Sequence, residues 1–195
     1  MTVDRTTVFR TPWFEIATVE PGAEPSGTTD PYYCVVRPAG VLAFVLDVDG
    51  NVVLVEQYRP PIGRLTLEMP AGTIDQGESA AEAVKREVLE ETGYLCEKWF
   101  YISPFRMMLN REDVVDFFFV GLDARRHDGF NAVESGETRI LPRLRFRELI
   151  KARRFEQMVA LGGVYLAETI AGISLLDDDL AVIESRLGAV QAQLK

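Results

Sequence analysis

Three glutamates stand close together in the segment REVLEETGY (86–94): Glu87, Glu90 and Glu91. On a helix, which turns by about 100° per residue, Glu90 lies about 60° to one side of Glu87 and Glu91 about 40° to the other. Like charges at such spacings destabilise a helix by roughly 0.2–0.5 kcal/mol per pair. The residues alone leave two readings open: a solvated acidic face, or a site for Mg²⁺ or Mn²⁺, whose binding would offset the repulsion.

The segment that carries these acids has clear signals for the start and end of a helix. Ser79 with Glu82 three residues later fits a capping box, and Gly93 suits the left-handed position after the last turn. A mostly apolar stripe between them is available to face the core, formed by Ala81, Val84, Val88 and Thr92. The sequence therefore predicts a helix between Ser79 and Gly93 that buries one face and holds the acids on another.

Apolar, β-branched and aromatic residues predict that the first half of the chain is mostly strand. The segment 40–58 reads as two apolar strands joined around Asp49-Gly50, which is a strong hairpin signal. Further strands are expected over 13–20, 32–38, 65–69, 114–122 and 139–146.

Two more helices are expected in the second half. One covers 146–172 and is broken or bent near Gly162-Gly163. The C-terminal segment begins with acids that suit a helix N-terminus. Its apolar residues recur at 3-4-3-4 spacing, which leaves open a coiled-coil-like seam or a helix packed on its own domain. These residues are Leu180, Ile183, Leu187, Val190 and Leu194.

Composition sets aside several classes of function. The net charge of −9 argues against a nucleic-acid binder, although a divalent cation would still allow phosphate-bearing small molecules. His127 is the only histidine, which excludes an HExxH metalloprotease. Cys34 and Cys96 have no CxxC spacing, so neither a disulfide scaffold nor a zinc site is indicated. No apolar run is long enough for a membrane span, and the start lacks a signal peptide, so a soluble cytoplasmic protein is expected.

The segment from Gly72 reads GTIDQGESAAEAVKREVLEETGY. It resembles the Nudix box, Gly-x5-Glu-x7-Arg-Glu-U-x-Glu-Glu-x-Gly-U, in which U is a bulky apolar residue. Tyr94 departs mildly from the usual aliphatic residue at the last position. For the fixed positions, a complete match by chance has a probability on the order of 10⁻⁸ per window. The residues that fill them are Gly72, Glu78, Arg86, Glu87, Glu90, Glu91 and Gly93.

The resemblance implies a fold and a reaction. The family fold is α/β, with a mixed β-sheet sandwiched between helices, and the box forms a loop-helix-loop. The reaction is hydrolysis of a nucleoside diphosphate linked to another moiety, in which cations neutralise the pyrophosphate and activate a water. Mg²⁺ is the expected cofactor, with Mn²⁺ as an alternative. The competing function is a domain that senses nucleotides without turnover, although such domains commonly have a damaged box.

The same resemblance implies the metal ligands. Glu87 and Glu91 match the principal ligands, and Glu90 matches an additional ligand or a support for the acids. Gly72 keeps the preceding backbone open, so that the carbonyl of Ala71 becomes a further candidate ligand.

Other residues are implied in catalysis beside the metal. Arg86 matches the residue that orients one carboxylate through charge-assisted hydrogen bonds, and Glu78 matches a residue near the metal cluster. In the ADP-ribose pyrophosphatase and nucleotide-sugar branch of the family, which the flanking sequence resembles, a glutamate from the loop after the box activates or positions the attacking water. Glu112 fits that role best, with Asp113 as runner-up, and a solvated loop acid is the alternative reading of both.

The flanking sequence VEQYRPPIGRLTLEMPAGTID (55–75) resembles the ADP-ribose pyrophosphatase and nucleotide-sugar branch. Arg59 and Glu68 are thereby expected in the substrate pocket; their alternative readings are a strand-end salt bridge and a partly buried acid. Members that hydrolyse ADP-ribose usually carry a proline about sixteen residues beyond the box, where this chain has RMMLNRED (106–113). ADP-ribose, cleaved to AMP and ribose 5-phosphate, therefore leads, with GDP-mannose or another nucleotide sugar as the alternative.

The chain is expected to divide into an N-terminal strand extension (1–38), a Nudix hydrolase domain (39–174) and a C-terminal helix (175–195). The extension is antiparallel and rich in large side chains, which a partner subunit could cover. Because members of this branch pair through that region, a homodimer is expected, with aromatic residues from the extension stacking on the nucleotide base. These residues are Trp13, Phe14, Tyr32 and Tyr33.

Overall fold

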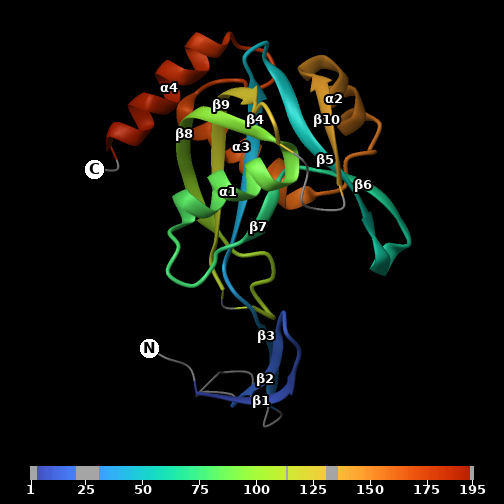
Figure 1. The fold of residues 1–195 in the computed structure, drawn as a ribbon. Coiled ribbons are helices and arrows are strands. Elements are labelled where there is room, and N and C mark those ends of the chain that lie inside the picture. The colour runs from blue at the N-terminus through green and yellow to red at the C-terminus, as the bar shows by residue number, and fades with distance from the viewer. Residues whose placement is uncertain (1–3, 21–30, 113, 131–135, 194–195) are drawn as a thin grey trace.

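The computed structural model describes residues 4–20, 31–112, 114–130 and 136–193, and Figure 1 shows its ribbon. The strands are β1 (Arg5–Arg10), β2 (Glu15–Val19), β3 (Tyr32–Val36), β4 (Gly40–Asp47), β5 (Asn51–Arg59), β6 (Arg64–Glu68), β7 (Ala71–Thr73), β8 (Tyr94–Phe105), β9 (Asp116–Arg126) and β10 (Gly136–Pro142). The helices are α1 (Ala80–Thr92), α2 (Arg143–Lys151), α3 (Met158–Ala171) and α4 (Leu180–Gln193), and a short 3₁₀ turn, η1 (Pro60–Ile62), separates β5 from β6.

The strands form two sheets. The larger has seven strands in the order β10-β5-β4-β9-β8, with β6 paired to β5 and β7 paired to β4. Strands β4 and β9 run parallel, with Val41 opposite Phe117, and the other pairs in this sheet are antiparallel. The smaller sheet is the antiparallel set β1-β2-β3.

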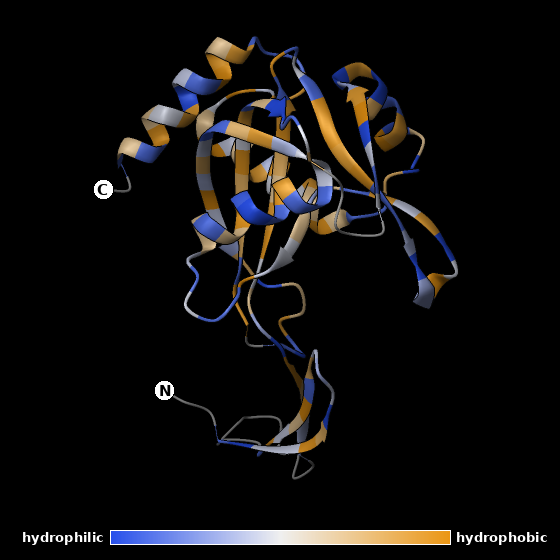
Figure 2. Cartoon of the chain, in the orientation of Figure 1, coloured by the Kyte–Doolittle hydropathy of each residue, from blue (hydrophilic) through white to orange (hydrophobic). Residues whose placement is uncertain are grey.

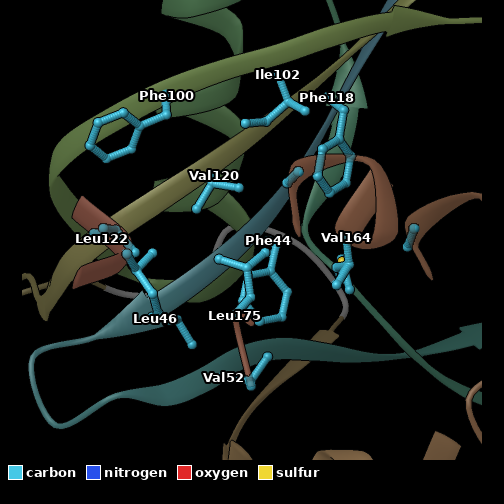
Figure 3. Packing of buried hydrophobic residues seen from close by; sticks show 14 of the residues in the cluster. Phe44, Leu46, Val52, Phe100, Ile102, Phe118, Val120, Leu122, Val164 and Leu175 are labelled. Atoms are coloured by element: carbon cyan, nitrogen blue, oxygen red, sulfur yellow. The ribbon is translucent and has the colours of Figure 1, made fainter. Parts of the chain in front are cut away.

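The larger sheet lies between helices, because successive side chains on a strand point to opposite faces. On β4, Leu42, Phe44 and Leu46 join a cluster with residues of α2, α3 and α4, whereas Val41, Ala43 and Val45 join a cluster with α1. Figure 3 shows the first of these clusters, and Figure 2 shows the apolar residues concentrated on the central strands. The expected mixed sheet between helices is confirmed.

The connection between the sheet and α3 differs from expectation. The strand predicted over 139–146 ends at Pro142, and α2 begins at Arg143. The helix predicted over 146–172 is two helices that separate at residues 152–157, while α3 runs through Gly162 and Gly163 without a break. The glycine at 163 serves packing instead, because a Cβ there would lie 2.4 Å from the Phe118 ring.

Strands β1, β7 and β8 were not predicted from the sequence. In β8 the burial pattern changes along its 12 residues, and partly exposed positions such as Glu97 and Lys98 weaken the apolar signal. The strand bends where its register against β9 shifts, between Tyr101 and Ser103.

The C-terminal helix packs on its own domain. Ile183 and Leu187 are 0% and 1% exposed and belong to the main core cluster, and Leu180 and Val190 pack against its edge. Among the two readings of the 3-4-3-4 pattern, the structure supports the helix packed on its domain; Leu194 lies outside the described residues. No helix in the described part of the chain is long and apolar enough to cross a membrane.

The N-terminal sheet stands away from the rest of the molecule (Figure 1). It contacts the loop before β9: Val35 N–H donates to the carbonyl of Arg111 at 2.7 Å, and Val35 forms an isolated bridge with Glu112. The Arg111 guanidinium lies 5.6 Å from the ring centroid of Tyr32. The chain then passes through Arg37 into β4.

Candidate active site

Helix α1 places the acids of the box. Its capping box is present: Ser79 Oγ accepts from the N–H of Glu82 at 3.3 Å, and the Glu82 carboxylate accepts from the N–H of Ser79 at 2.9 Å. Gly93 ends the helix with φ 71°, in the left-handed region. Because local residues determine both ends, the register that puts the acids on the face toward β7 is fixed by the sequence itself.

Glu87 and Glu91 are buried, at 7% and 6% exposure. The Glu87 carboxylate lies against the backbone of Gly72 in β7, where a Cβ would come within 1.9 Å of it. Glu91 accepts from the N–H of Ala71 at 2.9 Å and from Gln57 Nε2 at 2.8 Å. The two carboxylates are therefore held, one helical turn apart, against the backbone of β7.

Arg86 joins the other acids of the box. Its guanidinium donates to Glu78 in two hydrogen bonds of 2.9 Å, to Glu87 at 2.8 Å and to Glu90 at 3.1 Å. It also donates to the carbonyl of Thr73 at 2.8 Å. The hydrogen bond to Glu78 is the main cause that raises the pKa of Arg86, and the same bond lowers the pKa of Glu78. The positive charge of the Arg86 guanidinium thus offsets part of the repulsion among the carboxylates.

The donors at this site suit a divalent cation. Mg²⁺ is usually held by one or two carboxylates together with substrate phosphates and water, rather than by a complete set of protein ligands. Glu87 and Glu91 supply two buried carboxylates, and the missing Cβ of Gly72 leaves the space that the Glu87 carboxylate occupies. Within the described residues, no three or more Asp, Glu, His or Cys side chains gather as a metal site, so water and phosphate oxygens would complete the coordination.

Ala71 lies beside the acids as expected. The contact that the structure gives runs from its N–H to Glu91, so Ala71 positions that carboxylate through its amide. Whether its carbonyl also ligates a metal stays a prediction.

Glu112 lies in a second cluster, with Arg37 and Asp116. Arg37 donates to Glu112 Oε2 at 2.8 and 3.2 Å and to both oxygens of Asp116 at 2.6 and 2.9 Å. Asp116 also accepts from the N–H of Gly40 at 2.7 Å. The hydrogen bond to Asp116 is the main cause that raises the pKa of Arg37, against the opposing effect of burial. Asp113, the runner-up to Glu112, lies outside the described residues.

A small cavity connects the two clusters. It measures about 180 Å³, and Arg37 and Asp116 line it together with Ala71 and Gly72. The Glu112 carboxylate, which is 6% exposed, does not line this cavity but is paired with Arg37, which does. The role of Glu112 as the residue that activates water stays a prediction.

Arg59 and Glu68 lie in a larger cavity of about 640 Å³ between the β5–β6 hairpin and the α2–α3 connection. They form a bidentate ion pair across the two strands, with both N···O distances at 2.7 Å. Burial alone would raise the pKa of Glu68, but hydrogen bonds from Arg59 and Thr66 outweigh it and lower the pKa. The pair is therefore both a strand-end salt bridge and a wall of the cavity.

Three residues that hold the site were not predicted from the sequence. Gln57 fixes Glu91, and Arg37, which Asp116 holds in turn, fixes Glu112. Gln57 stands in the flanking sequence 55–75 that resembles the ADP-ribose pyrophosphatase and nucleotide-sugar branch, so its place in that segment was an available signal. For Arg37 and Asp116 the sequence offers none, because an arginine and an aspartate at strand ends are common.

Comparison with known protein families identifies the family to which this chain belongs. The family model described as NUDIX domain matches residues 36–158. The chain belongs to the Nudix family. Nudix hydrolases generally use a divalent metal, which agrees with the acidic donors beside Gly72.

Several relatives match part of the chain. An ADP-ribose pyrophosphatase of Bacillus subtilis (strain 168) is 34% identical over 85 residues, 41% of this chain and 46% of that protein. A methanol dehydrogenase activator of Bacillus methanolicus is 28% identical over 113 residues, 58% of this chain and 61% of that protein. An ADP-sugar pyrophosphatase of Mus musculus is 58% identical over 43 residues, 22% of this chain and 20% of that protein. In each case the match covers less than two thirds of the relative.

A solved structure shares the Nudix fold over most of the chain. The crystal structure of an ADP compounds hydrolase has a TM-score of 0.70 and covers 86% of this chain and 92% of its own. Its sequence identity is 22%, so the likeness supports the fold.

Proposed function

We propose that this Nudix protein hydrolyses the pyrophosphate bond of a nucleoside diphosphate linked to another moiety, with ADP-ribose as the leading substrate and AMP and ribose 5-phosphate as products. The observation that carries the proposal is the buried pair Glu87 and Glu91, held against the backbone of β7 within a complete box. The Bacillus subtilis and mouse relatives, an ADP-ribose pyrophosphatase and an ADP-sugar pyrophosphatase, support an ADP-linked substrate.

Each residue of the site has a proposed task. Glu87 and Glu91 would hold the cation, with Glu90 as a further ligand or support. When bound, a divalent cation, Mg²⁺ in our proposal, neutralises the pyrophosphate and activates a water. Arg86 keeps Glu87 and Glu90 oriented through its hydrogen bonds.

Glu112 is the proposed base for the attacking water. Both hydrogen bonds from Arg37 go to Oε2, so Oε1 is the oxygen through which Glu112 would act. A base acts in the transition state, so Glu112→Gln should lower kcat much more than it raises KM.

The test is metal-dependent turnover. Chelator should abolish hydrolysis of ADP-ribose and added Mg²⁺ should restore it. Glu91→Gln should lower kcat by about 100-fold or more at saturating Mg²⁺, because a neutral amide is a poor ligand for a hard cation. Glu97→Gln, on the exposed part of β8, is the matched control and should keep wild-type rates. Full activity of Glu91→Gln would contradict the metal assignment, and tight nucleotide binding without turnover would favour the sensing domain.

The two groups that the pyrophosphate joins are identified by assaying a panel of nucleotide substrates. ADP-ribose, GDP-mannose and other nucleotide sugars are compared by kcat/KM with Mg²⁺ and with Mn²⁺. A preference for GDP-mannose or another nucleotide sugar by tenfold or more would replace ADP-ribose as the leading substrate.

We also propose a homodimer that forms through the N-terminal sheet. Strands β1 to β3 and the turn between β1 and β2 expose several large apolar side chains, which a partner subunit would cover. These include Phe9 (57% exposed), Trp13 (77%), Phe14 (39%), Tyr32 (47%) and Tyr33 (51%).

The two free cysteines agree with the cytoplasmic location that we predict, because reducing compartments keep thiols free.

Removal of residues 1–36 tests the dimer and keeps Arg37 in place. The shortened chain should sediment as a monomer and lose activity, since the aromatic residues proposed to stack on the base are absent. The full chain should sediment as a dimer at micromolar concentration. A fully active monomer of the full chain would show that the sheet has another role.

A further inference from the structure

The larger cavity carries an excess of positive charge in a chain of net charge −9. Each of its glutamates has an arginine partner: Glu68 with Arg59, Glu156 with Arg64, and Glu56 with Arg139. The two remaining arginines of the wall are Arg153 and Arg154, and no ion pair reaches either of them from the described residues. Arg139 lies outside the lining and also pairs with Glu137, so the lining itself holds four arginines against three glutamates and keeps one net positive charge beside Arg153 and Arg154.

The turn that carries these arginines is unusual. Helix α2 ends with the N–H of Arg154 bonded to the carbonyl of Leu149 at 2.8 Å and the N–H of Arg153 bonded to the carbonyl of Ile150 at 2.9 Å. This is the Schellman arrangement, whose left-handed residue is usually glycine. Here it is Arg153, with φ 58°. A side chain kept in a strained backbone conformation points to a role for that side chain.

The larger cavity and the smaller one beside Gly72 share one lining residue. Gln157 lines both this cavity and the smaller one beside Gly72. Its Oε1 accepts from the N–H of Met69 at 2.9 Å, which fixes the side chain between the two cavities. A substrate whose pyrophosphate lies near Glu87 and Glu91 can therefore extend past Gln157 toward Arg153 and Arg154.

We propose that Arg153 and Arg154 form an anion subsite, which selects substrates that carry a further negatively charged group beyond the pyrophosphate. The proposal rests on the proposed function for the position of the pyrophosphate. The group is a phosphate or a carboxylate on one of the two moieties that the pyrophosphate joins. Two guanidinium groups on adjacent residues provide charge-assisted hydrogen bonds to either anion.

The experiment measures binding without turnover, so that it is independent of the hydrolysis assay. Two pairs of probes are titrated calorimetrically in the presence of chelator: NAD⁺ with NADP⁺, and UDP-glucose with UDP-glucuronate. Members of a pair differ by one phosphate or one carboxylate. In at least one pair, the full chain should bind the member that carries the additional phosphate or carboxylate about tenfold more tightly than the other member. Added salt should reduce this ratio of affinities. The pair that responds identifies the anion.

Three variants distinguish a specific anion subsite from a general effect of positive charge and from a structural role of the arginines. Arg153→Gly removes the guanidinium and suits the left-handed backbone, so the protein should stay folded with an equal or higher Tm while the ratio falls toward one. Arg154→Gln should also reduce the ratio. Arg125→Gln removes the same charge from the exposed part of β9 and should leave the ratio unchanged.

Three results would overturn the proposal. One is equal or undetectable binding of both members in each pair by the full chain. Another is an unchanged ratio in both Arg153→Gly and Arg154→Gln. The third is a reduced Tm of Arg153→Gly with an unchanged ratio, which would show that Arg153 only stabilises the end of α2. If the ratio behaves as expected and turnover is absent, the subsite stands and the proposed hydrolysis fails.

Discussion

The carboxylate of Glu87 occupies the space in which residue 72 would carry a Cβ: an added Cβ on Gly72 would lie 1.9 Å from Glu87 Cδ. Gly72→Ala should therefore displace Glu87 or β7, destabilise the fold by about 1–3 kcal/mol, and lower kcat by about 100-fold. Urea unfolding and steady-state kinetics measure the two effects.

Gly162 provides the control for this substitution. It lies exposed in α3, and an added Cβ there meets none of the described atoms within 4 Å. Gly162→Ala should stabilise the protein by about 0.5–1 kcal/mol, because alanine favours a helix interior. Wild-type activity and stability in Gly72→Ala would show that the site tolerates a displaced Glu87.

The C-terminal helix should contribute to stability within one chain. Ile183 is 0% exposed, whereas Val182 on the same helix is 45% exposed. Ile183→Ala should lower the free energy of unfolding by about 2–5 kcal/mol, and Val182→Ala should change it by less than about 0.5 kcal/mol. A loss of similar size in both variants, dependent on protein concentration, would instead indicate a seam between subunits.

The ion pair of Arg59 and Glu68 should make stability depend on acid pH. The pKa of Glu68 is lowered from 4.5 in the fold, so its contribution is fully present above pH 4.5 and is lost as pH falls through the folded pKa. Glu68→Gln should therefore be less stable than wild type at pH 7, and the difference should shrink toward about pH 3. Urea unfolding at both pH values gives the comparison, and a difference that is equal at both would rule out this contribution.

Cys96 should be unreactive in the folded protein. Burial is the main cause that raises the pKa of its thiol to about 12, and Asp123 adds to it. Since the thiolate is the nucleophile, alkylation by iodoacetamide at pH 8 should be at least about 100-fold slower than in the unfolded chain. A Cys34→Ser variant isolates the signal for mass spectrometry. Rapid alkylation of that variant while folded would mean that this part of β8 opens readily.

Helix α1 could be predicted because its signals are local. Ser79, Glu82 and Gly93 stand within the helix or next to it, and each makes the expected contact. The break between α2 and α3 could not, because a residue of the wrong type, Arg153, takes the left-handed position. Gly163 predicted a bend that the helix does not have. The glycine is explained instead by close packing of the helix on Phe118.

The candidate site also combines features that could be predicted from local sequence with features that could not. The spacing of the box predicted that Glu87 and Glu91 lie together on one helix. The partners that orient the carboxylates come from distant segments: Gln57 is 34 positions from Glu91, and Arg37 is 75 positions from Glu112. Pairings of that range depend on the sheet topology, which a motif does not encode.

The parallel pairing of β4 with β9 has a kinetic consequence. Val41 must meet Phe117 across the whole connection that contains β5, α1 and β8, so the chain must close a long loop before the central pair of strands gains any contact. The β4–β5 hairpin and α1 can form early from nearby residues, whereas the centre of the sheet forms late. We therefore expect refolding to take milliseconds to seconds, with its rate set by how fast two distant strands find each other.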